Sequence, residues 1–219
     1  MTHATVERLV VVVAVGPLDR AKSRLGPTLD PSERRTLVLA MLDDVLRAIR
    51  GAHASDLLVV TPDQELRALV APHNATVVLD EGHGTNAAIV TALASATVQA
   101  ADAVLILQGD LPQLSSDHVE QLRDALDRLT APGALLVPND DGGTSALGLR
   151  PPGAMPTAFG PDSGTRHRRS AADNGIALDE LPLIALASDV DTIEDLRQVG
   201  HVAGPATTAL LEQLGVLTR

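Results

Sequence analysis

The most constraining feature of this chain is an unbroken apolar run near its start, LVVVVAV, from Leu9 to Val15. Five of its seven residues are valine, and β-branched side chains favour extended backbone. The run has no alternation of polar and apolar residues, so neither face of such a strand meets water. Strands buried on both faces are typical of parallel sheets that are covered by helices. The run therefore predicts a strand of a parallel sheet.

Strand and helix patterns then alternate along the chain. Asp30-Pro31-Ser32-Glu33 predicts a helix start, with an N-cap acid, proline at the first helical position and a glutamate that closes a capping box. Further strands are expected at 57–60, 76–79, 104–107, 135–137 and 183–186, and further helices at 62–70, 86–98, 119–129 and 192–199. This alternation predicts an α/β sandwich with a mostly parallel sheet, and 219 residues suit a single domain, 1–219.

One long segment, 138–171, is rich in Gly, Pro, Ser and Asp and shows little periodicity. We expect a loop there. Loops of this length are more often functional than idle.

Composition excludes several classes of protein. The formal net charge of -11 disfavours binding to nucleic acid and to anionic membranes. No stretch approaches the roughly 20 apolar residues of a membrane helix, and cysteine is absent, so we expect a cytoplasmic protein without disulfides. With one Phe and neither Trp nor Tyr, base recognition must use backbone groups, small polar side chains and aliphatic walls.

Three aspartates follow predicted strands and form the first candidate site. Asp189 and Asp191 stand two apart, so on an extended chain their carboxylates point to the same side. Asp110 follows the strand at 104–107 and adds a third carboxylate. Ligands of open α/β sheets bind beyond the carboxyl ends of the strands, where these acids converge. Carboxylates and phosphate oxygens are the ligands that Mg²⁺ prefers, so we expect a magnesium site. The alternative is that these acids cap neighbouring helices or face solvent.

The loop after the first strand is basic in an otherwise acidic protein. It carries Arg20, Lys22 and Arg24, and Gly16 lets the backbone approach a ligand. Such cations stabilise the charge of a phosphoryl-transfer transition state. The spacing matches neither a P-loop nor G-x-G-x-x-G, and a solvated basic loop is the alternative.

Two polar segments complete the candidate residues. Gly84, Thr85 and Asn86 precede a predicted helix, whose N-terminal N–H groups suit an anion or a polar base edge; a simple turn explains the glycine equally well. A cradle for a small phosphorylated acid is expected from hydroxyls, glycine N–H groups and basic side chains at Thr144, Gly160, Ser163, Arg166 and His167. For His167, an anion partner or a structural hydrogen bonder is favoured over a metal ligand.

Four motifs in series resemble one family: AKSRL, GDLP, FGPDSGTRH and DVDTIEDL. The chain is similar from Val10 to about Leu196 to the phosphoenolpyruvate and 2-phospho-L-lactate guanylyltransferases of deazaflavin coenzyme F(420) biosynthesis. The resemblance implies a Rossmann-like three-layer sandwich of the nucleotide-diphospho-sugar transferase type. It implies transfer of GMP from GTP to the phosphate of a small phosphorylated acid, with release of pyrophosphate and with Mg²⁺ as cofactor.

The resemblance also implies roles for individual residues. Asp110, Asp189 and Asp191 match the metal ligands; Thr144, Gly160 and Ser163 match the acid contacts; Lys22 and Arg24 match the triphosphate loop; Gly84 to Asn86 match the nucleoside loop. Lys22, Arg24 and Asp110 are thus the expected catalytic residues. A homodimer and a hand-over of the unstable product to the next pathway enzyme are further hypotheses about partners.

The chain departs from the family at two places. Ala14-Val15-Gly16 stands where many relatives have P-x-K, and Gly84-Thr85-Asn86 where they often have G-L-N. The first departure puts one triphosphate contact in doubt, unless Arg20 or Lys22 replaces it, and the second puts the base preference in doubt.

Several alternatives remain open from sequence. The Ala-, Val- and Arg-rich composition, typical of GC-rich genomes, favours phosphoenolpyruvate as acceptor over 2-phospho-L-lactate and 3-phosphoglycerate. Sister transferases for molybdopterin or sugar phosphates lack support, because their A-G-G-x-S-x-R-M-G loop is missing, and a dinucleotide-dependent oxidoreductase lacks its glycine motif. A non-catalytic GTP-binding regulatory domain is the alternative of another class.

Overall fold

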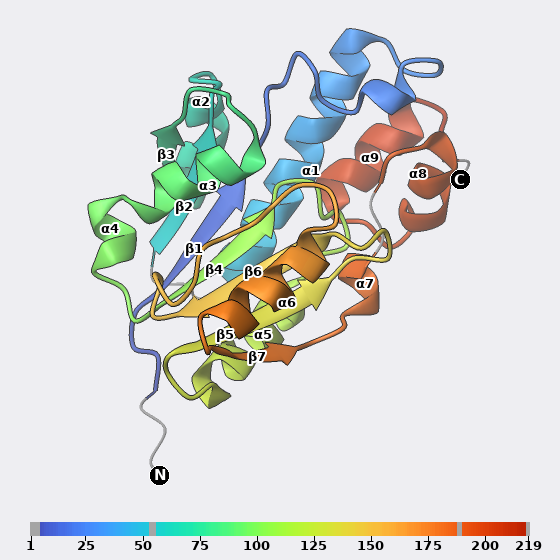
Figure 1. The fold of residues 1–219 in the computed structure, drawn as a ribbon. Helices are drawn as coiled ribbons and strands as arrows, with labels where there is room; N and C mark the ends of the chain where they lie inside the picture. Colours follow the sequence, from blue (N-terminus) through green and yellow to red (C-terminus); the bar gives the residue numbers. More distant parts are fainter. Residues whose placement is uncertain (1–4, 53–55, 188–189, 218–219) are drawn as a thin grey trace.

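The computed structural model describes residues 5–52, 56–187 and 190–217. Its centre is a seven-stranded sheet in the order β3-β2-β1-β4-β6-β5-β7 (Figure 1). The valine-rich run forms β1 (Leu9–Ala14), which lies between β2 (Asp56–Thr61) and β4 (Ala103–Gln108) and is parallel to both. β3 (Thr76–Leu79) continues the parallel part beside β2. The predicted α/β fold with a mostly parallel sheet is confirmed.

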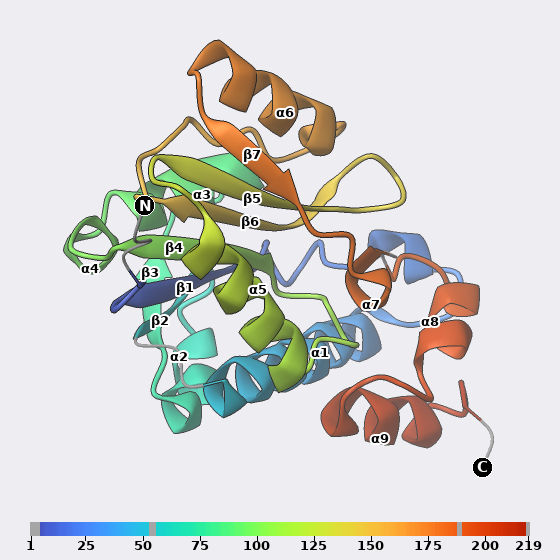
Figure 2. The ribbon, with the colours of Figure 1, turned by 90° about the horizontal axis from the view of Figure 1, so that it is seen from below.

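The two faces of β1 contact two separate apolar cores. Val11 and Val13 belong to one core, and Val10 and Val12 belong to the other. The first core includes side chains of α1 (Pro31–Gly51), α2 (Leu66–Val70), α5 (Ser116–Arg128) and α9 (Pro205–Gln213). The second includes side chains of α3 (Thr85–Leu93), α4 (Ala96–Gln99) and α6 (Ser163–Asp173). Figure 2 shows α1 and α5 on one side of the sheet and α6 on the other, so three layers are present.

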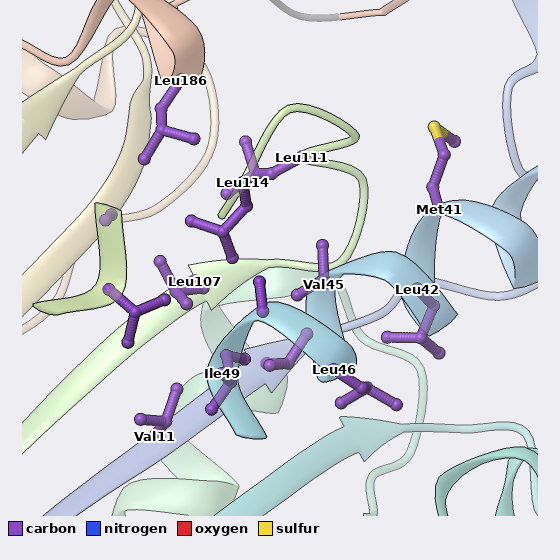
Figure 3. Packing of buried hydrophobic residues seen from close by; sticks show 14 of the residues in the cluster. Val11, Met41, Leu42, Val45, Leu46, Ile49, Leu107, Leu111, Leu114 and Leu186 are labelled. Carbon is purple, nitrogen blue, oxygen red and sulfur yellow. The ribbon is translucent and has the colours of Figure 1, made fainter. Parts of the chain in front are cut away.

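Helix α1 shows how local sequence fixes the first core. Asp30 accepts a hydrogen bond from the Glu33 N–H, and Glu33 accepts one from the Asp30 N–H, so the predicted capping box is confirmed. Leu37, Met41, Val45 and Ala48 recur at helical spacing and are all buried. Figure 3 shows Val45 and Ile49 of this helix beside Val11 and Leu107 of the sheet.

The segment 138–171 was wrongly predicted as a loop. It contains β6 (Thr144–Arg150), which lies between β4 and β5 (Gly133–Pro138) and is antiparallel to both, and the start of α6. All seven residues of β6 are buried, so no polar alternation marks this strand. Gly148 is required in it, because a Cβ there would lie 2.6 Å from Leu126 Cδ2 of α5.

The remaining differences lie in short elements. The predicted strand at 183–186 is wrong: the segment forms α7 (Ile184–Ala187), and the last strand is β7 (Ala177–Glu180), parallel to β5. Leu183 and Leu186 are buried three residues apart whereas Ile184 is exposed, which is helical spacing. The helix expected at 86–98 is two helices, because the Ser95 side chain caps a new one.

The C-terminal part adds two helices on the side of α1. The helix predicted at 192–199 is confirmed as α8 (Ile193–Val199), which Thr192 caps through a capping box, and α9 was not predicted. Short 3₁₀ helices are formed by Ser23–Leu25 (η1) and Ala71–His73 (η2). In the part of the chain that the structure describes, none of the helices has the length and apolarity needed to cross a bilayer.

Candidate active site

The candidate site lies beyond the carboxyl ends of β1 and β4, as expected for an open α/β sheet. A cavity of about 500 Å³ opens there, a volume in the usual range for a small-molecule site. Gly109 holds the end of β4 against β1 by donating its N–H to the Ala14 carbonyl. Because a Cβ at Gly109 would lie 2.7 Å from Val15 Cγ2, only glycine lets β4 present Asp110 at this distance from β1.

A lysine joins two of the predicted acids in the wall of this cavity. Lys22 Nζ lies 2.6 Å from Asp110 Oδ2 and 3.7 Å from Asp191 Oδ1. The Lys22 side chain is only 7 % exposed, and its backbone is left-handed, with φ at 50°. Arg24 Nη1 contacts the other oxygen of Asp191. The basic loop and the acids therefore form one charged cluster.

The charge state of Asp110 follows from this cluster. Burial by itself raises the pKa of the carboxyl group, because it penalises the charged form. The charge of Lys22 and its hydrogen bond act in the other direction and prevail, so the pKa of Asp110 is lowered from its ordinary value. Asp110 is thus a carboxylate at neutral pH.

The acids fit a hard cation. Asp110 and Asp191 converge on a single ammonium group, and their oxygen atoms are the donor type that Mg²⁺ takes together with phosphate oxygens and water. The third predicted ligand, Asp189, lies outside the described residues. Among the residues that are described, His, Asp and Glu form no cluster of three or more placed to share an ion.

The predicted acid cradle lines the same cavity as this charged cluster. Thr144 begins β6 and Ser163 begins α6, and the Ser163 hydroxyl donates to Thr144 Oγ1 over 2.9 Å. Gly160, with φ at 116°, also lines the cavity and turns the chain into α6. Arg166 lies beside this turn, with Nη2 3.1 Å from where a Cβ of Gly160 would stand, but it does not line the cavity.

His167 lies behind the cradle and does not reach the cavity. It is fully buried, its Nδ1 is 3.0 Å from Thr144 Oγ1, and its ring packs edge-on against Phe159 at 4.8 Å. Burial, and then the positive charge of Arg166, lower the pKa of His167 to about 4. The ring is therefore neutral at physiological pH.

Two smaller cavities continue from the first. One of about 310 Å³ is lined by Gly16, Arg20, Lys22 and Thr85, and one of about 80 Å³ by Gly16, Gly84 and Thr85. Thr85 borders all three, so the predicted nucleotide residues other than Asn86 line neighbouring cavities, which together are called the groove below. Asn86 does not line it: its Oδ1 accepts the N–H of Phe159 over 3.0 Å and so ties α3 to the acid cradle.

One acid of the cavity of about 80 Å³ was not among the predicted residues. Asp80 lines that cavity, and its Oδ1 accepts the Gly82 N–H at 2.5 Å. Asp80 Oδ2 is buried and has no hydrogen-bond partner among the described residues. The signal was available, since Asp80 directly follows β3 just as Asp110 follows the end of β4. Asn139, Asp141 and Gln108 were also missed and line the largest cavity.

Solved structures share this fold. The chain superposes on a crystal structure from Desulfovibrio desulfuricans G20, provisionally assigned to the nucleotide-diphospho-sugar transferases, with a TM-score of 0.78, 19 % identity, and 95 % and 96 % of the two chains covered. A nucleotidyl transferase from Methanothermobacter matches with a TM-score of 0.66, 15 % identity, and 94 % and 99 % covered. The fold is that of the nucleotidyltransferases.

Sequence comparison gives the family. Residues 9–218 match the family described as "Guanylyl transferase CofC like". A phosphoenolpyruvate guanylyltransferase from Sphaerobacter thermophilus is 40 % identical over 195 residues, covering 88 % of this chain and 93 % of the relative. A 2-phospho-L-lactate guanylyltransferase from Methanothermobacter thermautotrophicus is 32 % identical, with 86 % and 82 % covered. The chain belongs to the CofC-like guanylyltransferase family, a family of nucleotidyltransferases, and the resemblance drawn from its four motifs is confirmed.

Proposed function

We propose that this protein transfers GMP from GTP to the phosphate of phosphoenolpyruvate, giving enolpyruvoyl-2-diphospho-5′-guanosine and pyrophosphate in coenzyme F(420) biosynthesis. The observation that carries the proposal is that the Lys22–Asp110–Asp191 cluster and the Thr144–Ser163 hydroxyls line one cavity. Such a cavity holds a polyphosphate at one wall and a small acid at the other. Similarity to relatives named for this reaction supports the same assignment.

The reaction needs little from the protein beyond placement and charge. An oxygen of the acid's phosphate attacks the α-phosphorus of GTP, a new P–O bond forms, and the bond from the α-phosphorus to the bridging oxygen of the β-phosphate breaks. The attacking oxygen is already an anion, so no general base takes a proton. Alignment of the two phosphates and compensation of their charges then supply the catalysis.

The cations of the basic loop perform that compensation. Lys22 pairs with Asp110 and Arg24 pairs with Asp191. Both cations can also contact the triphosphate and the leaving pyrophosphate and compensate their negative charge. Asp110, Asp191 and Asp189 would hold Mg²⁺. When bound, Mg²⁺ neutralises phosphate oxygens and orients the nucleotide for in-line attack.

The acceptor is assigned to the cradle. Thr144, Ser163 and the backbone at Gly160 offer hydrogen-bond donors to a carboxylate, and Arg166 adds positive charge near the turn. Relatives named for phosphoenolpyruvate, 3-phospho-D-glycerate and 2-phospho-L-lactate are 40 %, 36 % and 32 % identical to this chain. We therefore propose phosphoenolpyruvate and keep the other two acids as outcomes of the test.

The guanine base is assigned to the end of the groove lined by Asp80. Guanine presents two neighbouring donors, N1–H and the N2 amino group, and a carboxylate is the acceptor that matches both. Asp80 lines this cavity, which is otherwise walled by small side chains and backbone; its Oδ1 accepts the Gly82 N–H, and its buried Oδ2 has no partner among the described residues. We assign Oδ2 to one of these guanine donors, and this supports GTP as the nucleotide.

Location and assembly belong to the same proposal. GTP and phosphoenolpyruvate are cytoplasmic metabolites, so we propose a cytoplasmic enzyme. A homodimer and direct hand-over of the product to the next enzyme stay predictions; sedimentation of the purified chain tests the first.

A pyrophosphate-release assay tests the reaction. The purified protein is given Mg²⁺, one of the four nucleoside triphosphates, and one of the three acids. Release only with GTP and phosphoenolpyruvate, lost in Asp191→Asn, is the expected result. Release with another acid would correct the acceptor alone. GTP binding without any release would instead indicate the non-catalytic regulatory domain.

A further inference from the structure

The hydrogen bonds around His167 fix which ring nitrogen carries the proton. The backbone N–H of Ala158 donates to His167 Nε2 over 2.9 Å. Nε2 must therefore be the acceptor nitrogen, and in a neutral imidazole the other nitrogen, Nδ1, carries the hydrogen. Burial of the ring and its low pKa of about 4 keep it neutral. His167 is thus locked in one tautomer by the backbone of the segment that precedes α6.

This tautomer determines what Thr144 can do. Nδ1–H of His167 donates to Thr144 Oγ1 over 3.0 Å, and the Ser163 hydroxyl donates to the same oxygen over 2.9 Å. A hydroxyl oxygen has two acceptor positions, and both are filled. The only hydrogen-bonding capacity left on Thr144 is its own O–H, which can only donate.

The number of hydroxyl hydrogens left to donate is the same if the hydrogen bond between the two hydroxyls has the opposite direction. Thr144 then donates to Ser163, and the remaining O–H belongs to Ser163. In both arrangements the His167 hydrogen fills one acceptor position of Thr144, and one hydroxyl hydrogen of the pair remains to be given. Both residues line the cavity of about 500 Å³, which is the proposed place of the acid substrate.

We propose that His167 is a positioning residue that holds the Thr144–Ser163 hydroxyl pair as a hydrogen-bond donor to an anionic oxygen of the acid substrate. The inference rests on the proposed function, because it assigns a ligand to the proposed acid cradle. An anionic oxygen at Thr144 accepts the offered hydrogen, whereas an amide NH₂ at Thr144 meets an oxygen whose two acceptor positions are already filled. His167 therefore favours acids over their neutral amides without touching them.

Two variants separate this role from simple packing. In His167→Asn the amide NH₂ stands near the place of Nδ1 and can still donate to Thr144, but the partner of the Ala158 N–H is lost. In His167→Gln the amide oxygen reaches the place of Nε2 and can accept from Ala158, but the donor to Thr144 is lost. Both variants lose the ring contact with Phe159, so a purely structural role predicts equal effects.

The measurements are binding of phosphoenolpyruvate by calorimetry and KM for each substrate, with thermal unfolding as the folding control. We expect His167→Gln to weaken phosphoenolpyruvate about tenfold, the value of one well-placed hydrogen bond, and to leave KM for GTP unchanged. His167→Asn should stay near wild type. Phosphoglycolate and its carboxamide test the choice between an acid and its neutral amide. The wild type should bind the acid more tightly, and this preference should fall in His167→Gln only.

Equal losses in the two variants, or an equal rise of both KM values in His167→Gln, would overturn the role of His167 and leave the proposed reaction intact. If the wild type binds phosphoenolpyruvate but transfers no GMP, the proposed reaction fails, and the calorimetric comparison still decides the role of His167. If the wild type binds none of the acids, both proposals are wrong.

Discussion

Replacing Lys22 by Met tests the charged cluster most sharply. Methionine keeps most of the alkyl chain that is buried here and removes the ammonium group that contacts Asp110 and Asp191. Breaking a buried pair costs about 3–5 kcal/mol, and an exposed pair is worth at most about 1 kcal/mol. The two acids are 38 % and 35 % exposed, which places this cluster between those limits and toward the lower one.

We therefore expect a loss of about 1–2 kcal/mol in the free energy of unfolding without metal. For a chain of this length that corresponds to a fall in Tm of about 2–8 °C. The turnover number should fall about 10²- to 10³-fold, the usual cost of removing a group that stabilises transition-state charge.

Magnesium supplies a further signature. The two carboxylates of the variant have lost their ammonium partner, so added Mg²⁺ should raise the Tm of Lys22→Met more than that of the wild type. The assays are thermal unfolding in EDTA and in Mg²⁺, and pyrophosphate release. Arg47→Met is the matched control, because Arg47 is an exposed residue of α1 that pairs with Asp43, and its loss removes the same charge at a residue that lines none of the three cavities. If the two variants behave alike, the assignment of Lys22 is refuted.

Three further predictions concern other parts of the molecule. Asp44→Ala should lower stability by about 3 kcal/mol in chemical denaturation, because this buried carboxylate accepts two backbone N–H groups at the start of α9; a loss under 0.5 kcal/mol would contradict it. Asp80→Asn should abolish the preference for GTP over ITP, which lacks the N2 amino group; an unchanged ratio of kcat/KM would remove Asp80 from base recognition. The pKa of His167 is lowered in the folded state, so the unfolded state gains a proton first as pH falls from about 6.5 to 4. Over this range the wild type should therefore lose about 2–3 kcal/mol more in the free energy of unfolding than His167→Asn. Parallel curves of unfolding free energy against pH would contradict this prediction.

The central fold could be predicted because its signals are local. The valine run of β1 has no polar residue to place in water, and the capping box of α1 uses side chains only three residues apart. The second half was harder. β6 is buried along its whole length and contains Gly148, whose role is visible only when Leu126 of α5 lies against it.

The candidate site, like the fold, could be predicted only in part. The rule that ligands bind beyond strand ends brings Asp110 and the basic loop to one place, and the structure brings Asp191 there as well. The same rule should have identified Asp80. The burial of His167 behind Thr144 could not be predicted, because it depends on a segment before α6 donating the Ala158 N–H to the ring. Likewise, no local pattern indicates that Asn86 supports the acid cradle.

The most direct test of the central claim is detection of the transferred group itself. The wild-type protein is incubated with GTP, Mg²⁺ and phosphoenolpyruvate, and the products are followed by mass spectrometry together with pyrophosphate. The proposal predicts one molecule of enolpyruvoyl-2-diphospho-5′-guanosine for each pyrophosphate released, and neither product in Asp191→Asn. Pyrophosphate with free GMP, or no consumption of GTP with any of the three acids, would contradict it.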